Sequence, residues 1–311
     1  MKYLLKRNLA KLAVAGFIGA FVANAHAGPI ILGGDDLTDH GFRIGGANFE
    51  GWLYIEKAVN NLLTSETRAG SHGIDIAALG SAANLTFTSS NAGGAIGSAA
   101  NVLSKSIGFF DGAAAITSFF AALAAGTVNP AMIWIAGTGA ANDLGTAEGA
   151  ALTANAAAIN SFGASGGGIM AHGSGADAYG WLSALLPGLT NVGGCSSTGA
   201  TLTAAGQAAF PGLSNSDIDA NAGPCHSNFQ GDFGGLTTLA FDGRSVANGG
   251  PRSYIIGGGA ATVIQCGQQG QPPCSTQVPT QVPEPGVLPL LALAFLGMLS
   301  AMRRRVNYLR S

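Results

Sequence analysis

Charged side chains are scarce in this chain of 311 residues. They make up 10% of the sequence, whereas hydrophobic residues make up 47%; globular proteins commonly contain about 25% charged residues. Disordered chains combine low hydrophobicity with high charge, so this composition predicts a folded body with a sizeable core. Glycine is abundant, at 49 residues, but follows no fixed period, which excludes a collagen-like fibre and indicates a loop-rich protein.

Acidic residues are absent from both ends of the chain. The first 27 residues carry four basic residues, and the residues after 285 carry four arginines. The six remaining basic residues stand against all sixteen acidic residues, so the part between the ends has a net charge of −10. Contacts to phosphate need Lys and Arg, and this acidic body argues against a nucleic-acid partner.

Complete catalytic motifs are also missing. The sequence contains no P-loop and no H-E-x-x-H zinc motif. Gly257-Gly258-Gly259 follows a predicted strand, but no convincing helix with the spacing of a dinucleotide fingerprint comes after it. The sequence alone therefore names no cofactor.

The first 27 residues have the three parts of a secretory signal peptide. A basic segment precedes an apolar run from Leu12 to Ala23, and Ala25-His26-Ala27 forms a small-x-small cleavage site before Gly28. The alternative is an N-terminal membrane anchor, but the apolar run is short for a span of about 20 residues. We expect cleavage by signal peptidase and a mature start at Gly28.

The other end of the chain carries three features in a fixed order, within residues 282–311. Pro283-Glu284-Pro285 comes first, an apolar segment over 287–302 follows, and Arg303-Arg304-Arg305 comes last. Basic residues after an apolar helix keep that side in the cytoplasm, and the prolines keep the preceding stretch extended. The alternative is an ordinary C-terminal anchor that stays attached.

These three features resemble the PEP-CTERM sorting signal of Gram-negative bacteria. The resemblance implies processing by an exosortase, a transient membrane anchor through the helix 287–302, and delivery to the cell surface or to an exopolysaccharide matrix. A Gln-, Pro-, Ser- and Thr-rich stretch over 265–281 reads as a linker. It would join the tail to an exported domain over 28–264.

Four cysteines lie in the C-terminal half of the exported part: Cys195, Cys225, Cys266 and Cys274. An even number in an oxidising compartment predicts disulfides. Three pairings are possible, and we favour Cys195–Cys225 with Cys266–Cys274 because each closes a local loop. No C-x-x-C spacing supports a zinc site.

Short apolar runs alternate with helical patterns along the body. Strands are predicted at 29–32, 74–79, 132–136, 168–171, 236–241 and 253–256, and helices at 52–63, 114–125, 146–162 (with Thr146 as N-cap) and 178–186. The Gly-, Ser- and Asn-rich segment 80–112 reads as an insertion or long loop. This alternation predicts an α/β domain with a mostly parallel sheet flanked by helices.

The stretch from Ile133 to Gly173 adds a second resemblance. It runs from a strand through Asp-Leu-Gly-Thr and a helix to a Gly-Gly-Gly strand ending at His172-Gly173. It is similar to the centre of class I glutamine amidotransferase-like folds, including the ThuA-like branch, and implies a flavodoxin-like domain. The family's elbow cysteine is replaced by His172, which removes thiol chemistry.

Three polar segments are candidates for a site. Asp35, Asp36, Asp39 and His40 follow the first strand, at the sheet edge where ligands bind; they can hold a hard cation, supply a general base, or simply form a turn. His172 and Ser174, with Asp177, follow the fourth predicted strand and pair a nucleophile with a base, although the glycines of a nucleophile elbow are missing. The plain alternative there is a Gly-rich turn.

His226 is the third candidate, because it adjoins the predicted disulfide of Cys225 and is held rigidly. The plain alternative is a structural loop pinned by the bridge. If His40, His172 and His226 converge, they can form a metal or acid–base site. Mutual ring distances beyond about 8 Å would exclude a shared metal, whose ligand bonds are about 2 Å long.

Two functions remain open. The first is an exported surface or matrix protein whose amidotransferase-like body is a non-catalytic scaffold, which is the interpretation we favour because no catalytic motif is complete. The second is an extracellular hydrolase or metal-dependent enzyme that uses Asp35 and Asp36 with His172 or His226. A pocket gathering these residues would favour the enzyme, and scattered positions would favour the scaffold.

Overall fold

The computed structural model describes residues 28–70, 72–138, 144–196, 198–219 and 223–258, all of which lie within the first of two compact units, Met1–Gln265. The predicted signal peptide, linker and sorting tail, including Pro283, Glu284, Pro285 and the three arginines, lie outside the described residues. So do Cys266 and Cys274. Among the helices described, none combines the length and hydropathy needed to cross a bilayer.

Five parallel strands form the centre of the main sheet. They are β1 (Ile30–Gly33), β4 (Ile76–Leu79), β5 (Ile107–Phe110), β6 (Met132–Ile135) and β7 (Gly168–Ala171), in the order β5-β4-β6-β7-β1. All residues of β1, β4, β6 and β7 are buried, as expected for parallel strands covered on both faces. The predicted α/β class with a mostly parallel sheet is confirmed.

Antiparallel strands extend the sheet beyond β1. β12 (Ser253–Gly258) pairs with β1, with β10 (Ser227–Gly231) and with β11 (Thr237–Phe241), while β8 (Leu189–Gly193) pairs with β10 and β9 (Thr201–Leu202) pairs with β11. The strands predicted near 236–241 and 253–256 are confirmed. This half of the sheet brings the C-terminal part of the body beside the first strand.

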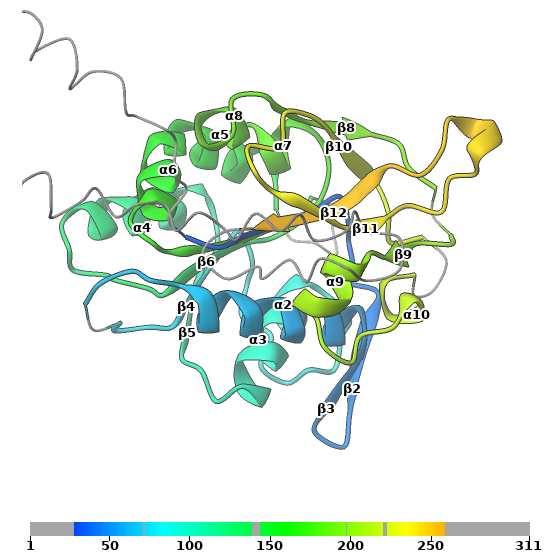
Figure 1. Ribbon diagram of the computed structural model, residues 1–311. Coiled ribbons are helices and arrows are strands. Elements are labelled where there is room, and N and C mark those ends of the chain that lie inside the picture. Colours follow the sequence, from blue (N-terminus) through cyan, green and yellow to red (C-terminus); the bar gives the residue numbers. More distant parts are fainter. Residues whose placement is uncertain (1–27, 71, 139–143, 197, 220–222, 259–311) are drawn as a thin grey trace, which may run out of the picture. The chain divides into compact units, whose positions relative to one another are not determined.

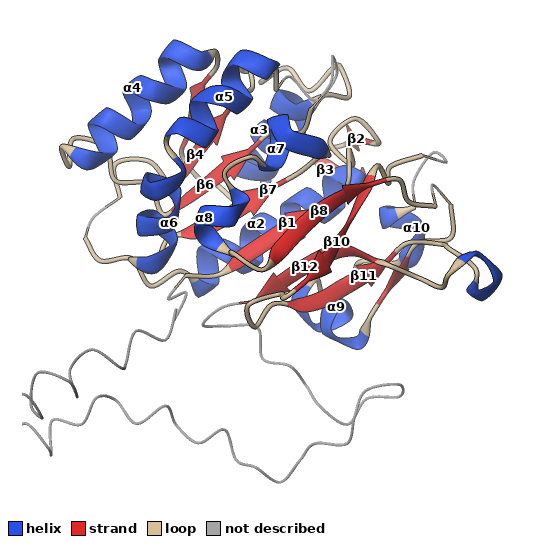
Figure 2. Cartoon of the chain, turned by 90° about the horizontal axis from the view of Figure 1, so that it is seen from above, coloured by secondary structure: helices blue, strands red, loops and turns tan. Residues whose placement is uncertain are grey.

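Helices cover both faces of the sheet (Figures 1 and 2). One face carries α2 (Gly51–Ser65), α3 (Ala92–Val102), α9 (Ala204–Ala209) and α10 (Asn215–Ile218). The opposite face carries α4 (Ala113–Ala124), α5 (Thr146–Ala154), α6 (Ala156–Ala164), α7 (Gly175–Tyr179) and α8 (Leu182–Leu185). A short 3₁₀ helix, η1, covers Val246–Asn248. The core therefore has two layers, one on each side of the sheet.

Of the two interpretations of 80–112, an insertion or a long loop, the long loop is wrong. This segment contains α3 and the edge strand β5. Its small residues serve close packing: a Cβ added at Gly94 would lie 2.9 Å from the indole ring of Trp52 on α2. Glycine here allows two helices to approach, and a composition typical of loops therefore hid a helix.

The single helix predicted over 146–162 is also wrong, because it divides into α5 and α6 at Asn155. The Asn155 amide donates to the carbonyl of Ala151 at 2.8 Å, a local bond that competes with helix geometry. Gly145, not Thr146, is the N-cap, and Glu148 accepts from its backbone N–H at 2.7 Å. The segment predicted as one helix over 178–186 similarly divides into α7 and α8.

A hairpin that the sequence patterns did not predict follows β1. It consists of β2 (Gly41–Ile44) and β3 (Ala47–Glu50), which pair with each other in a separate two-stranded sheet. Its polar side chains face the body, where Arg43 contacts Ser98 and Asn101 on α3. Phe42 and Phe49 stack on each other and are partly exposed. The second strand of the hairpin leads directly into α2, which begins at Gly51.

Candidate functional site

Two adjacent aspartates follow β1 and point in opposite directions. Residues 34–36 pair with residues 224–227, and successive side chains along a paired segment alternate between faces. Asp36 N–H donates to Pro224 at 2.9 Å, the N–H of His226 donates to Gly34 at 2.8 Å, and Asp35 forms an antiparallel bridge with Cys225. This pairing directs Asp35 into the core and Asp36 toward the surface.

Glycines before the two aspartates are required by close contacts. A Cβ added at Gly33 would lie 1.6 Å from Asp35 Oδ2, and one at Gly34 would lie 2.0 Å from the carbonyl oxygen of Ser227. Both distances are shorter than van der Waals contact allows. The Gly33-Gly34 pair therefore lets the carboxylate and the neighbouring strand approach the backbone.

Asp35 belongs to a sealed network with His172 and Trp134. The Nδ1 atom of His172 lies 2.8 Å from Asp35 Oδ1, and the indole N–H of Trp134 donates to His172 Nε2 at 3.0 Å. All three side chains are fully buried. Because an indole N–H can only donate, Nε2 of His172 is an acceptor, and the proton of the neutral ring resides on Nδ1 and is donated to Asp35.

The proposed pairing of His172 with Ser174 is not supported by this geometry. Both ring nitrogens of His172 are engaged, so neither is available to accept a proton from Ser174. Ser174 is the N-cap of α7, and its carbonyl accepts from the Thr138 hydroxyl at 3.3 Å. Asp177 accepts from the Thr146 hydroxyl at 3.0 Å. The plain alternative, a Gly-rich turn with His172 hydrogen-bonded to neighbouring backbone, is not what the structure has either, because His172 bonds to the side chains of Asp35 and Trp134.

Asp36 is buried and is the centre of a second cluster, which reaches the surface at His226. Its Oδ2 atom lies 2.5 Å from Nε2 of His226, and its Oδ1 atom lies 3.4 Å from Nε2 of His40. Asp36, Asp39 and His40 each present one ligand atom, and these three atoms lie within 4.8 Å of one another. These three residues and His226 are called the Asp36 cluster below, and the first three are its candidate metal ligands.

Charges within the Asp36 cluster shift the pKa values of its members. Burial alone would raise the pKa of Asp36, but hydrogen bonds from His226 and His40 outweigh it and the pKa is lowered. The hydrogen bond to Asp36 raises the pKa of His226, against its partial burial. Burial, and then the charge of Asp36, raise the pKa of Asp39. The cluster thus favours an ionised Asp36 beside a protonated His226.

The three histidines therefore converge only in part. His40 and His226 both contact Asp36, whereas His172 contacts Asp35 in the core. His172 leaves the set of candidate metal ligands because it has no free nitrogen, and Asp35 is not among the residues whose ligand atoms gather near Asp36. The hypothesis of one site shared by all three histidines is replaced by two separate Asp–His groups.

The predicted disulfide between Cys195 and Cys225 is present. It joins the segment after β8 to the residue directly before His226. The Asn228 amide adds hydrogen bonds to the carbonyls of Val192 and Gly194. The bridge therefore holds the His226 segment against the neighbouring strand, in agreement with the predicted rigid position of His226.

Some functional residues were missed by sequence reasoning. Trp134 was recognised only as part of a strand, and Tyr54 and Tyr179 only as helix residues. Burial, and then the charge of Asp35, raise the pKa values of both tyrosines well above the ordinary value. The hydroxyl of Tyr179 donates to Gly33 at 2.8 Å. No spacing in the sequence links these residues to Asp35.

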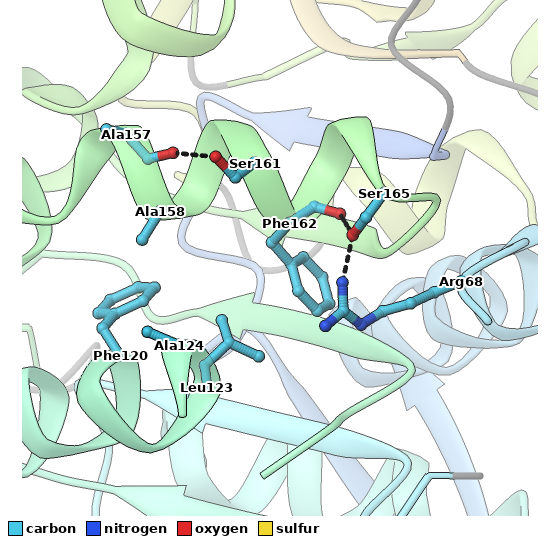
Figure 3. Close-up of a pocket in the computed structure, with 9 residues that line it drawn as sticks. All are labelled: Arg68, Phe120, Leu123, Ala124, Ala157, Ala158, Ser161, Phe162 and Ser165. Carbon is cyan, nitrogen blue, oxygen red and sulfur yellow. Dashed lines mark hydrogen bonds between the residues drawn. The ribbon is translucent and has the colours of Figure 1, made fainter. Parts of the chain in front are cut away.

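A pocket of about 420 Å³ lies elsewhere, between α4 and α6. Figure 3 shows Phe120 and Leu123 facing Phe162, with Arg68 at one end of the pocket. Arg68 lies over the ring of Phe162, 4.8 Å from its centroid, and donates to Ser165. None of the residues of either Asp–His group lines this pocket, so it does not gather the predicted site residues.

Comparison with known proteins gives no relative from which a function could be inferred. No protein-family model, no curated protein and no solved structure matches the chain.

Proposed function

We propose that the chain is an exported protein of the cell surface or extracellular matrix of a Gram-negative bacterium, and that its α/β body is a non-catalytic scaffold. The observation that carries the destination is the order Pro-Glu-Pro, apolar segment and triple arginine over residues 283–305. Signal peptidase and an exosortase would process the two ends, and an exopolysaccharide is the proposed matrix partner.

The disulfide of the body is consistent with this destination. Disulfides persist in oxidising compartments and are rare in the cytosol. The Cys195–Cys225 bridge lies beside the sheet, where it closes a loop of the body. A protein that leaves the cytoplasm would retain it.

The sealed Asp35 network supports the scaffold role. His172 occupies the position where the resembled amidotransferases carry their nucleophile, and both of its ring nitrogens are engaged. A histidine without a free nitrogen is neither a base nor a ligand. Instead, the hydrogen bonds of His172 to Asp35 and Trp134 link β1, β6 and β7 near the carboxyl ends of these strands.

The order of the parallel strands supports a flavodoxin-like relationship in the proposed fold. Flavodoxin-like sheets have the strand order 2-1-3-4-5. The order β5-β4-β6-β7-β1 corresponds to it when β4 is counted first and β1 takes the fifth place. The N-terminal strand would then occupy the position of the last strand, as in a circular permutation.

Mass spectrometry of both termini tests the destination. The full chain is expressed in a Gram-negative host with and without an exosortase. We expect a new N-terminus at Gly28 in both hosts, and loss of the C-terminal tail only with the exosortase. Replacing Pro283, Glu284 and Pro285 by alanine should leave the tail attached and the protein in the membrane fraction. A Gln277→Ala variant in the linker is the matched control.

Two results would overturn the proposal. The first is an intact chain in the cytosol with reduced thiols and both ends unprocessed. The second is turnover of hydrolase substrates by the wild-type protein that is lost in a folded His226→Ala variant, since this would make the body an enzyme. The first result concerns the destination alone, and the second concerns the scaffold alone.

A further inference from the structure

The Asp36 cluster contains carboxylate oxygens that need a partner. Oδ1 of Asp36 is buried from solvent and is contacted at long range by Nε2 of His40, at 3.4 Å, while Oδ1 of Asp39 is buried and receives no hydrogen bond from the residues that the structure describes. The Asp36 side chain is 10% exposed, and its other oxygen already accepts from His226. A buried carboxylate oxygen without a partner is unfavourable, and a cation at this point would satisfy both atoms.

The ligand atoms are close enough for one ion. Three of them, one each from Asp36, Asp39 and His40, lie within 4.8 Å of one another. Two ligand atoms of a tetrahedral zinc site with bonds of about 2.1 Å are about 3.4 Å apart. Small rotations of the Asp39 and His40 side chains, which are both only partly buried, bring the set to that spacing.

The mixture of ligand types indicates the class of metal. Calcium and magnesium prefer sites built from oxygen alone, whereas imidazole nitrogen suits zinc and its neighbours among the first-row transition metals. Two carboxylates and one imidazole form a mixed set of this second kind. Three protein ligands also leave at least one coordination position open to water.

We propose that Asp36, Asp39 and His40 bind one divalent transition-metal ion, with zinc as the representative, and that His226 is a positioning residue. His226 binds the Asp36 oxygen that faces away from the metal and holds the carboxylate in place, as outer-shell partners of metal ligands do. This site is independent of the sorting tail and goes beyond the proposed function of the body.

The disulfide contributes to the position of His226. Cys225 precedes His226 and is bonded to Cys195, and the His226 N–H donates to Gly34 two residues before Asp36. The ligand loop after β1 and the positioning histidine are therefore held by one strand pairing.

Zinc binding is measured on the full chain, produced without an affinity tag and stripped with a chelator. Isothermal titration with Zn²⁺, and metal analysis after dialysis, should give about one zinc per chain. Asp39→Asn and His40→Gln should each abolish stoichiometric binding, and His226→Asn should weaken it by about ten- to a hundredfold. The matched control is His72→Gln, which alters a histidine paired with Glu66 at 3.2 Å outside the cluster and should bind as wild type does.

Each variant is first shown to be folded by circular dichroism and thermal unfolding. Asp36→Asn can fail to fold because Asp36 is buried, so the partly buried Asp39 and His40 decide the test. The proposal is overturned if folded wild-type protein binds no zinc at micromolar concentrations, or if Asp39→Asn and His40→Gln bind as the wild type does. Tighter binding of Ca²⁺ than of Zn²⁺ would overturn the assigned class of metal.

Discussion

Asp35 and Asp36 are neighbours in the chain, and each contacts a histidine, yet the two pairs have opposite environments. Asp35 and His172 are fully buried, and the indole N–H of Trp134 donates to the remaining ring nitrogen of His172. Asp36 contacts His226, whose side chain is 51% exposed, and His40 at the surface. We call Asp35–His172 the sealed pair and expect it to contribute to stability; we call Asp36–His226 the open pair, because a ligand can reach it from solvent. The two environments differ because consecutive side chains of this paired segment point to opposite faces.

The comparison predicts that the largest loss of stability comes from the sealed pair. His172→Ala leaves the Asp35 carboxylate and the Trp134 indole N–H without their partner. We expect a decrease of about 3–5 kcal/mol in the free energy of unfolding, the usual cost of removing one member of a buried polar pair. Urea denaturation followed by circular dichroism measures it.

A double variant sharpens this first test. Asp35→Ala combined with His172→Ala should cost less than the sum of the two single changes, because each single change leaves the other group unpaired. If His172→Ala costs no more than His226→Ala, then the two pairs do not differ in the way proposed here.

The next largest effect is expected from the disulfide, which holds the segment of the open pair. Replacing both Cys195 and Cys225 by alanine should lower the free energy of unfolding by about 2–4 kcal/mol, because the unfolded chain regains the freedom of a loop that spans a sequence separation of 30. Thermal unfolding of the oxidised wild type and of the variant measures this effect. A variant as stable as the wild type would show that the strand pairing holds His226 without the bridge.

A smaller decrease in the free energy of unfolding is expected from replacing Trp134, which donates to His172. Trp134→Phe removes the N–H that fixes the tautomer of His172 and leaves Nε2 without a donor. The expected cost is about 1–3 kcal/mol for one unsatisfied buried group, measured by urea denaturation. Trp181→Phe is the matched control: it removes an indole whose N–H donates to a backbone carbonyl, of Ala178, and not to a histidine. The ring nitrogen signals of His172 in NMR should change in the first variant and not in the second.

The smallest effect is expected from the open pair, and it should depend on pH. The pKa of His226 is raised above its ordinary 6.5, so its contribution is fully present below pH 6.5 and is lost as the pH rises through the raised value. The pKa of Asp36 is lowered from 3.8, so the contribution is present above pH 3.8 and is lost as the pH falls through the lowered value. The stability difference between wild type and His226→Asn should therefore be largest between these two limits.

That difference should not exceed about 1 kcal/mol, because half-exposed ion pairs are screened by water. Thermal unfolding of metal-free protein across this pH range, with His72→Gln as the control, measures it. A difference that is constant with pH would show that His226 acts through packing and not through its charge.

Local patterns were sufficient for most of the main strands. Apolar runs such as 132–136 predicted buried strands because a parallel sheet covered on both faces requires them. The same reasoning failed for 80–112, where glycine and alanine serve the packing of α3 against α2, and for the break at Asn155, where one side-chain hydrogen bond ends the helix. Composition alone does not distinguish a small residue in a tight interface from one in a loop.

The sequence predicted which residue types form the candidate site, but not which of them lie together in space. Asp36, Asp39 and His40 lie within one short segment after a strand, and their proximity follows from the chain itself. His226 lies 190 residues from Asp36, and only the antiparallel pairing of residues 34–36 with 224–227 brings them together. Trp134 reaches His172 because β6 and β7 are neighbours in the sheet.

The amino-acid sequence by itself determined the low charge, the basic ends, the order of Pro-Glu-Pro, apolar segment and arginines near the C-terminus, the buried strands and the cysteine that precedes His226. Tertiary structure decided which aspartate is sealed and which is open, because the side of an extended strand that faces the core depends on the partners on each side of it. It also decided that His172 has no free nitrogen, since that depends on an indole contributed by a different strand.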